Sequence, residues 1–310
     1  MTSAFRHPRT ALPAVALLAA ALTTGCGHGS SGGASTPAAA AATTVTASAR
    51  PTDAAFKGLE QHFAARLGVY AVDTGSGREV AYRPDERFAF ASTIKSLAAG
   101  ALLRGATDEE LDKVVTYRQE DVLQWAPVTS QHVATGMKLR DLAAAAIQYS
   151  DNTAANLVMA ELGGPEAVQR TLRELGDPTT NVDRTEPTLN EATPGDPRDT
   201  STPRAFAADL RRYVLGDVLT EDRRRLLTDW LVGNTTGAPY IRAGVPADWK
   251  IGDKTGTAGY GTRNDVAVAW PSGGRSPIVL VVLSDRGKPD ATSDDALIAE
   301  ATKAVVTALG

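Results

Sequence analysis

Ser92 and Lys95 could together supply an activated nucleophile. Two residues separate them, so both side chains lie on the same face if a helix begins near Phe90. A lysine amine at that distance can tune the reactivity of a serine hydroxyl. The same spacing arises about once by chance in a chain of this length. The Ser92–Lys95 spacing alone is therefore weak evidence for a catalytic serine.

A second polar group, Ser150-Asp151-Asn152, lies between two segments with helical patterning. Its simplest interpretation is a helix cap, in which Ser150 or Asp151 accepts hydrogen bonds from free backbone N–H groups. A catalytic role for Ser150 or Asn152 needs support from elsewhere in the chain. Without that support, capping is the favoured interpretation.

A third group, Lys254-Thr255-Gly256-Thr257, falls in a predicted strand. Strand alternation puts Lys254 and Gly256 on one face and the two threonines on the other. A glycine inside a strand suggests that a ligand approaches the backbone closely. The alternative is an edge strand with a solvated lysine and a bulge at the glycine.

Glu186 and Asn190 lie in an irregular stretch from about Asp177 to Thr200, which is rich in Pro, Asp, Thr and Asn. Loops of this length are usually functional or disordered. A carboxylate held in a water-poor site can act as a general base. A glutamate on a surface loop is otherwise the ordinary interpretation of Glu186.

The elements that must position these groups follow from periodicity and turn residues. Helical patterning begins at Asp53, which is a candidate N-cap, and dominates the middle of the chain. The expected helices are 53–66, a helix starting near 90, 139–149, 153–162 and 294–309. The expected strands are 67–73, 79–82, 249–257, 265–270 and 278–284, with a hairpin joining the first two.

The strands lie near both ends of this pattern, and the helices lie between them. We therefore predict an α/β (α+β) fold: a five-stranded antiparallel sheet flanked by terminal helices, with an inserted all-helical domain. The sheet domain is assigned to residues 53–86 and 233–310, and the helical domain to residues 87–232. Their junction is the predicted place for a substrate cleft.

The four groups occur once each, in the order SxxK, SDN, ExxLN, KTG, and each falls on a different predicted element. This combination resembles that of the class A serine β-lactamases, and the resemblance extends from Asp53 to Gly310. Flanking residues match as well. They are Arg184, Asp199, Trp125 at the position of a rim aromatic, and Asn234-Thr235-Thr236-Gly237.

The resemblance implies that Ser92 attacks a β-lactam carbonyl and that the N–H groups of Ser92 and Thr257 stabilise the oxyanion. The proton from Ser92 passes either to Lys95 directly or to Glu186 through a water molecule, and both routes stay open. Ser150 then relays a proton to the departing nitrogen, and Lys254 supplies positive potential.

The same resemblance assigns the second half of the reaction to Glu186, which activates a water held with the help of Asn190. Substrate contacts are implied for Asn152, Thr255, Gly256, Thr257 and Trp125. Arg242 is a candidate for binding the substrate carboxylate, with a surface arginine as its alternative. The Glu186-Pro187 bond is expected to be cis, and Arg184 is expected to pair with Asp199.

The N-terminus has the pattern of a secretory signal over residues 1–26. Arg6 and Arg9 precede an apolar run, and Cys26 ends a lipobox-like stretch. Lipidation of Cys26 would anchor the protein to the membrane, whereas ordinary cleavage would release it. Residues 27–52 are rich in Gly, Ser, Ala and Thr and form a predicted linker. We thus expect a secreted or lipid-anchored protein.

Composition narrows the function classes. A formal net charge of −4 gives no reason to expect nucleic-acid binding, and a single cysteine permits no intramolecular disulfide. The four histidines show no metal-ligand spacing, so neither a metal nor a cofactor is expected. The partner expected is a small β-lactam, bound by a monomer.

Two other functions share part of the motif set. A D,D-peptidase or other penicillin-binding protein also carries SxxK, SDN and KTG, but Glu186 with Leu189-Asn190 argues against it. A non-hydrolysing β-lactam sensor would stay acylated and signal through a membrane segment. The main prediction is a serine β-lactamase that confers antibiotic resistance.

Overall fold

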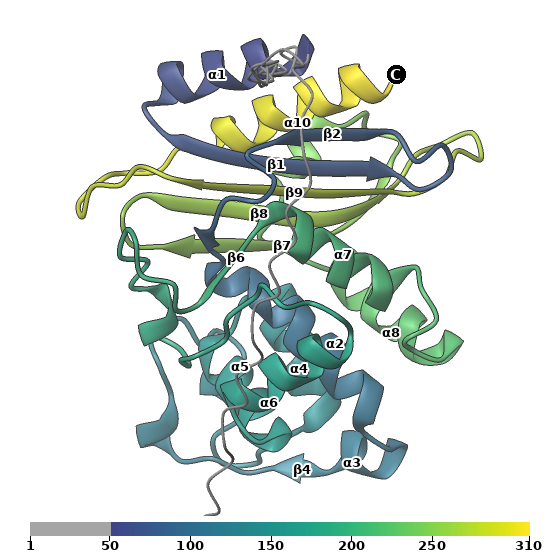
Figure 1. Cartoon of the computed structure of the whole chain (residues 1–310). Helices are drawn as coiled ribbons and strands as arrows, with labels where there is room; N and C mark the ends of the chain where they lie inside the picture. The colour runs from purple at the N-terminus through teal and green to yellow at the C-terminus, as the bar shows by residue number, and fades with distance from the viewer. Residues whose placement is uncertain (1–50) are drawn as a thin grey trace, which may run out of the picture. The chain divides into compact units, whose positions relative to one another are not determined.

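The framework of the protein is a five-stranded antiparallel sheet with the strand order β2-β1-β9-β8-β7, shown in Figure 1. The computed structural model describes residues 51–310. The sheet therefore joins strands from the two ends of the described chain. The strands are β1 (Arg66–Asp73), β2 (Glu79–Tyr82), β7 (Lys250–Ala258), β8 (Thr262–Trp270) and β9 (Ile278–Asp285).

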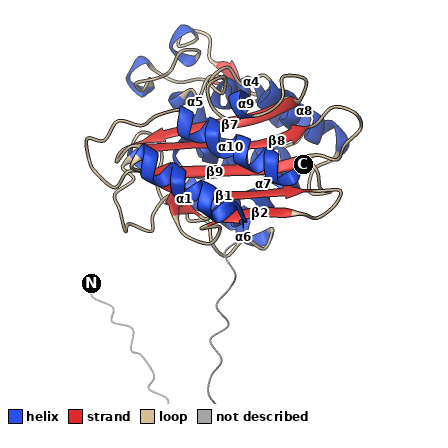
Figure 2. Cartoon of the chain, turned by 90° about the horizontal axis from the view of Figure 1, so that it is seen from above, coloured by secondary structure: helices blue, strands red, loops and turns tan. Residues whose placement is uncertain are grey.

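Both faces of this sheet are covered, which explains why its central strands are apolar along nearly their whole length. On one face α1 (Pro51–Phe63) and α10 (Ala296–Leu309) lie side by side, as Figure 2 shows. They enclose a core that includes Phe56 and Ile298. The opposite face packs on helices through a larger core that includes Phe206.

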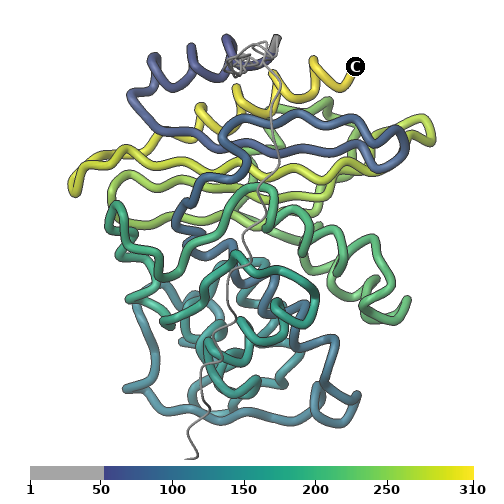
Figure 3. The backbone as a smooth tube through the Cα atoms, in the orientation of Figure 1, coloured from purple at the N-terminus to yellow at the C-terminus, as the bar shows by residue number. Residues whose placement is uncertain are grey.

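The helices between β2 and β7 in the chain form the layer on that second face, except α9 (Ile241–Gly244), which packs against α10 on the first face. The tube in Figure 3 traces the connections. The α-helices are α2 (Ile94–Gly105), α3 (Asp108–Asp112), α4 (Leu139–Gln148), α5 (Asn152–Leu162), α6 (Pro165–Glu174), α7 (Pro203–Val214), α8 (Glu221–Val232) and α9 (Ile241–Gly244). Short 3-10 helices are η1 (Ala91–Thr93), η2 (Gln119–Asp121), η3 (Thr129–Gln131) and η4 (Thr188–Asn190).

Local sequence explains where several of these elements begin and end. In the β1–β2 hairpin the Asp73 carboxylate accepts hydrogen bonds from the N–H groups of Gly75 (2.9 Å) and Ser76 (3.1 Å). Gly77 takes φ +72°, which favours glycine. The helix α5 ends at Gly163 with φ +97°, the usual left-handed C-terminal cap.

Two pairs of very short strands complete the fold. β3 (Phe88–Ala89) pairs with β6 (Thr200–Ser201), and β4 (Val114–Val115) pairs with β5 (Met137–Lys138). The first pair ties the segment before Ser92 to the end of the long loop. Sequence analysis did not predict these strands, because two residues are too short to show alternation.

The predicted fold class is confirmed, including the five antiparallel strands. The first helix begins at Pro51 and Asp53 lies inside its first turn, so the prediction that Asp53 caps it was wrong. The described residues belong to one compact unit. The division into a sheet domain and a helical domain stays a prediction. The signal sequence, Cys26 and nearly all of the linker lie outside the described residues.

Candidate active site

Ser92 lies in η1, where the chain turns from β3 into α2. Its side chain is almost buried, and the preceding residue, Ala91, has φ +52°, an uncommon conformation for alanine. The Ser92 Oγ donates a hydrogen bond to Glu186 Oε1 at 3.0 Å. The hydroxyl is thus held next to a carboxylate from a segment 94 residues further along the chain.

Lys95 follows on the first turn of α2, and its ammonium group is fully buried. Its Nζ forms an ion pair with Glu186 Oε1 at 2.9 Å and donates to Asn152 Oδ1 at 2.7 Å and to the Ser150 carbonyl at 2.9 Å. Burial lowers the pKa of Lys95, whereas the nearby Glu186 carboxylate opposes that shift. The lysine is therefore easier to deprotonate than an exposed one.

Glu186 is held from several directions, although it lies in a loop. Asn156 on α5 grips its peptide group twice: the Glu186 N–H donates to Asn156 Oδ1 at 2.9 Å, and Asn156 Nδ2 donates to the Glu186 carbonyl at 2.8 Å. Asn190 Nδ2 donates to Glu186 Oε2. The Glu186 side chain has no exposed surface, so bulk water has little access to its carboxylate.

The loop itself is closed by an ion pair at its two ends. Arg184 Nε lies 2.5 Å from Asp199 Oδ2, and Arg184 also pairs with Glu191. The buried Asp199 carboxylate accepts two further hydrogen bonds, from the N–H groups of Asp183 and Arg184. The predicted Arg184–Asp199 pair and the predicted cis Glu186-Pro187 bond are both confirmed.

The Ser150-Asp151-Asn152 group combines structural and polar contacts. Asp151 caps α5 by accepting a hydrogen bond from the Ala154 N–H at 2.9 Å, which confirms the capping prediction for that residue. Ser150 has φ +56° and directs its hydroxyl between two lysines. The Ser150 Oγ accepts from Lys254 Nζ at 3.0 Å and from Lys95 Nζ at 3.4 Å.

On β7, Lys254 is fully buried, and Gly256 lies against η1. A Cβ atom at Gly256 would come within 2.9 Å of the Phe90 carbonyl oxygen, so glycine permits the strand to approach the nucleophile segment. Burial and, to a smaller extent, the positive charge of Lys95 lower the pKa of Lys254 to about 7. The Thr255 hydroxyl is 2.6 Å from that of Thr236.

Two residues predicted to contact substrate, Arg242 and Trp125, make their hydrogen bonds to other parts of the protein. Arg242 is ion-paired at 2.7 Å with Asp253, a residue with no exposed surface, and donates to the Val232 carbonyl at the end of α8. Trp125 is 63% exposed, and its indole N–H donates to the Tyr149 carbonyl at 3.1 Å. Neither contacts Ser92 or Glu186 through a hydrogen bond.

Two further residues of this site were not predicted from the sequence. One is Asn156, described above. The other is Arg263, which faces Thr257 across the β7–β8 hairpin and donates from Nη1 to Thr257 Oγ1 at 2.7 Å. The hairpin register, counted back from its tight turn, would have placed Arg263 there. Arg263 also pairs with Asp295 at 2.9 Å.

The arrangement can support covalent hydrolysis. The buried Glu186 carboxylate lies within hydrogen-bonding distance of both the Ser92 hydroxyl and the buried Lys95 ammonium group, and a second lysine adds positive charge. In residues 51–310 no three His, Cys, Asp or Glu side chains are grouped so that they could hold a metal ion. The site is that of a serine hydrolase that forms an acyl-enzyme.

Comparison with known proteins narrows this class. The model of the beta-lactamase enzyme family matches residues 51–309. A β-lactamase of Amycolatopsis lactamdurans is 57% identical over 267 residues, covering 85% of this chain and 88% of the relative. A β-lactamase of Bacillus licheniformis is 54% identical over 254 residues, covering 82% of each. Both relatives are matched along most of their length.

Solved structures agree with the sequence comparison. A class A β-lactamase from Clostridium kluyveri has a TM-score of 0.82 at 47% identity, with 83% of this chain and 98% of that chain covered. The β-lactamase from Streptomyces albus G has a TM-score of 0.82 at 49% identity, with 84% and 100% covered. The chain therefore belongs to the β-lactamase enzyme family, and its structural neighbours are of class A.

Proposed function

We propose that this protein hydrolyses the amide bond of β-lactam antibiotics through an ester on Ser92 and so confers resistance. The observation that carries the proposal is the position of Glu186, whose Oε1 is 3.0 Å from Ser92 Oγ and 2.9 Å from Lys95 Nζ. A base at that place can serve both the nucleophile and a water that later attacks the ester. The high identity to named β-lactamases supports the same function.

In acylation, Ser92 Oγ bonds to the carbonyl carbon and loses its proton to the Lys95–Glu186 pair. Glu186 Oε1 is bonded to the Ser92 hydroxyl and is also paired with Lys95 Nζ, so the proton is assigned to the Lys95–Glu186 pair rather than to one residue. The N–H groups of Ser92 and Thr257 are proposed to hold the oxyanion. The close approach of Gly256 to η1 supports this pairing, because it brings the two backbones together.

Breaking the carbon–nitrogen bond requires a proton on the departing nitrogen, and Ser150 is proposed to deliver it. Its hydroxyl accepts hydrogen bonds from Lys254 and Lys95, so its own hydrogen is free to point toward substrate. Either lysine can replace the proton that Ser150 gives up. With these two buried amines beside it, the Ser150 hydroxyl can pass a proton to the departing nitrogen and is more than a helix cap.

In deacylation, Glu186 removes a proton from water, and that water attacks the ester carbonyl and frees Ser92. Asn190 is proposed to help to hold the water, and Asn156 fixes the Glu186 peptide. This step separates a β-lactamase from a penicillin-binding protein or a sensor, which stay acylated. The buried, multiply held Glu186 therefore favours turnover over both alternatives.

Substrate binding is proposed to use the β7 edge and the segment after α4. Thr255, Thr257 and Lys254 would contact the substrate carboxylate, and the Arg263 guanidinium beside Thr257 would add charge. Arg242 is assigned a supporting role, since it neutralises buried Asp253 next to Lys254. Asn152 and Trp125 are proposed to contact the substrate's side chain.

Mass spectrometry of protein incubated with penicillin tests this mechanism. Wild-type protein should turn over nitrocefin, Ser92→Ala should lose that activity, and Glu186→Gln should accumulate a stable adduct on Ser92. Glu191→Gln is the matched control, since Glu191 lies in the same loop but is exposed and bonded to Arg184. An unmodified Ser92 would overturn the mechanism, and a lasting adduct on wild type would favour the D,D-peptidase or the sensor.

We further propose that the protein acts as a monomer outside the cytoplasm, tethered through a lipid on Cys26. The charged, apolar and cysteine-ending N-terminal sequence supports the export proposal. No helix within residues 51–310 is long and apolar enough to span a membrane. Radiolabelled palmitate should enter the wild type but not Cys26→Ser, and light scattering should give the mass of one chain. A soluble, unlabelled wild type would instead indicate release.

A further inference from the structure

A pocket separate from the active site lies beside the loop that carries Glu186. It has a volume of about 420 Å³ and is lined by residues 192–198 and Thr200 of that loop, by Arg87 and Ala89 around β3, and by Thr262 at the start of β8. Arg66 and Asp285, from the ends of β1 and β9, complete it. None of the residues to which we assign a catalytic role lines this pocket.

The three arginines that line the pocket differ in their partners. Arg66 pairs with Asp285 at 2.7 Å and with Glu86 at 3.3 Å, and Arg198 pairs with Asp196 at 2.7 Å. Arg87 has no carboxylate partner among the residues that the structure describes, and its hydrogen bond goes to the neutral Thr200 Oγ1 at 2.9 Å. The Arg87 guanidinium is therefore free to pair with an anionic occupant.

Thr262 supplies an independent sign of a ligand. The residue is 1% exposed, and its Oγ1 is buried without a hydrogen-bond partner in the described part of the chain. Buried hydroxyls normally have a hydrogen-bond partner, because leaving one unpaired is energetically costly. Thr262 lines the pocket, so an occupant that accepts a hydrogen bond would satisfy this hydroxyl.

We infer that this pocket binds a small organic anion. Its carboxylate or phosphate oxygens would accept hydrogen bonds from the Arg87 guanidinium, whose planar fork suits such groups, and from the Thr262 hydroxyl. The nonpolar part of the ligand would lie against Ala89, Pro194 and Pro197, which also line the pocket. The volume exceeds what a bare inorganic ion needs, which is why we assign an organic body.

The position of the pocket links its occupancy to the active site. Ala89 precedes Ser92 by three residues, Thr200 directly follows the loop-closing Asp199, and Thr262 directly precedes Arg263. A ligand bridging Arg87 and Thr262 would hold residues 192–200 against the sheet edge. The occupied pocket therefore braces the loop that positions Glu186 and slows amide hydrogen exchange along that segment.

Calorimetric titration of the purified full chain with phenyl phosphate, benzoate and inorganic phosphate tests the inference. At constant ionic strength, phenyl phosphate or benzoate should bind at one saturable site. Arg87→Gln and Thr262→Val should each weaken that binding at least tenfold. The control Arg225→Gln should leave it unchanged, because Arg225 is an exposed arginine of α8. Inorganic phosphate that binds as tightly as phenyl phosphate would exclude the organic body.

Thr262→Val also guards against a folding artefact. Valine keeps the shape of the side chain and removes an unpaired buried hydroxyl, so the ligand-free variant should melt at the same or a higher temperature than wild type. Its loss of binding would then reflect the missing donor. If all three anions fail to bind, or if they bind Arg87→Gln and Thr262→Val as tightly as wild type, the inference is wrong. If amide hydrogen exchange in residues 192–200 is unchanged when the ligand saturates the site, the ligand does not brace the loop.

Discussion

Lys254 is unusual at the residue scale, because a fully buried ammonium group lies one hydrogen bond from the Ser150 hydroxyl and close to a second lysine. Burial and the charge of Lys95 lower its pKa to about 7, so it loses its charge as the pH rises through neutrality. The nearest compensation comes from buried Asp253 and Asp265, whose own pKa values burial raises. The positive charge at the β7 edge is therefore pH-sensitive.

We expect kcat/KM for a carboxylate-bearing penicillin to fall on the alkaline side with an apparent pKa of about 7. The reason is that free enzyme with neutral Lys254 attracts the substrate carboxylate less strongly. In Lys254→Arg the charge persists at every accessible pH, so this limb should disappear, although the bulkier side chain lowers activity overall. Stopped-flow rates between pH 5 and 10 check this. An identical alkaline limb in both proteins would contradict it.

Asn156 acts on Glu186 through the backbone and is a positioning residue. Asn156→Ala removes both bonds to the Glu186 peptide, which are 2.8 and 2.9 Å long. Deacylation should slow about tenfold or more, because small displacements of a base are costly. Acylation should change less, and stability should fall by about 1–3 kcal/mol. Rapid-quench mass spectrometry of the acyl-enzyme separates the two steps, and equal losses in both would refute a specific effect on Glu186.

The residues themselves were largely predictable from their order in the chain, but their partners were not. The four motifs drew attention to Ser92, Lys95, Ser150 and Glu186, and the structure brings these residues together, but the individual contacts between them come from the structure alone. Arg242 and Arg263 illustrate the limit. Both are arginines near β7, and only the register of the hairpin determines which one faces Thr257.

At the scale of elements, the long loop keeps its shape through its closing ion pair. Asp199 is 1% exposed and accepts hydrogen bonds from the Arg184 side chain and from two backbone N–H groups. The strand pair β3–β6 begins next to it and leads to Ser92 on the other side. The loop, the nucleophile helix and the sheet edge thus share one junction.

Replacing Asp199 by Asn should destabilise the protein by about 3–5 kcal/mol, the usual cost of breaking a buried ion pair on one side. The Glu186 segment should loosen, so deacylation should decline more than acylation. Glu120→Gln is the control, because it breaks the exposed Arg118–Glu120 pair (74% and 66% exposed side chains) and should shift stability by less than about 1 kcal/mol. Urea unfolding of both variants measures these changes in stability. Equal losses of stability in the two variants would refute the role of the Arg184–Asp199 ion pair in holding the loop.

The longer elements were predictable because each buries a patterned face. The expected strands 79–82 and 278–284 match β2 and β9 to within a residue, since apolar runs end at turn residues there. The β3–β6 and β4–β5 pairs depend on contacts between distant segments instead, as with Ala89 and Thr200. A pattern of two residues is too short to predict such a pairing.

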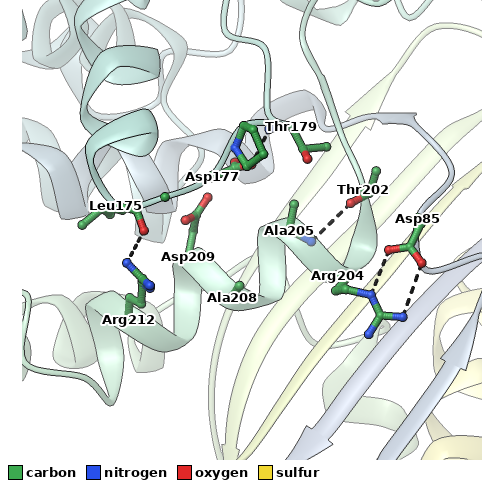
Figure 4. Close-up of a pocket in the computed structure, with 12 residues that line it drawn as sticks. Asp85, Leu175, Asp177, Thr179, Thr202, Arg204, Ala205, Ala208, Asp209 and Arg212 are labelled. Carbon is green, nitrogen blue, oxygen red and sulfur yellow. Dashed lines mark hydrogen bonds and ion pairs between the residues drawn. The ribbon is translucent and has the colours of Figure 1, made fainter.

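At the scale of the whole molecule, α7 connects the sheet to the helical layer and carries a buried acid at its centre. Asp209 is 1% exposed, faces Asp177 at the pocket drawn in Figure 4, and shares a hydrogen bond with it. Burial, together with the charge of Asp177, raises the pKa of Asp209 to about 9. Burial also acts to raise the pKa of Asp177, but hydrogen bonds from Thr180 and Thr179 hold it below its usual value. The proton therefore resides on Asp209.

This proton makes global stability depend on pH. Asp209 is protonated in the folded state up to about pH 9, whereas in the unfolded chain it ionises near pH 4. Its contribution is thus complete below about pH 4 and is lost as the pH rises to about 9, at up to about 1.4 kcal/mol per pH unit. In Asp209→Asn this dependence should vanish, so the urea midpoint should fall less than that of wild type between pH 5 and pH 8. The control Asp290→Asn, on an exposed loop, should follow wild type. Parallel pH profiles for all three proteins would show that Asp209 is ionised in the folded state.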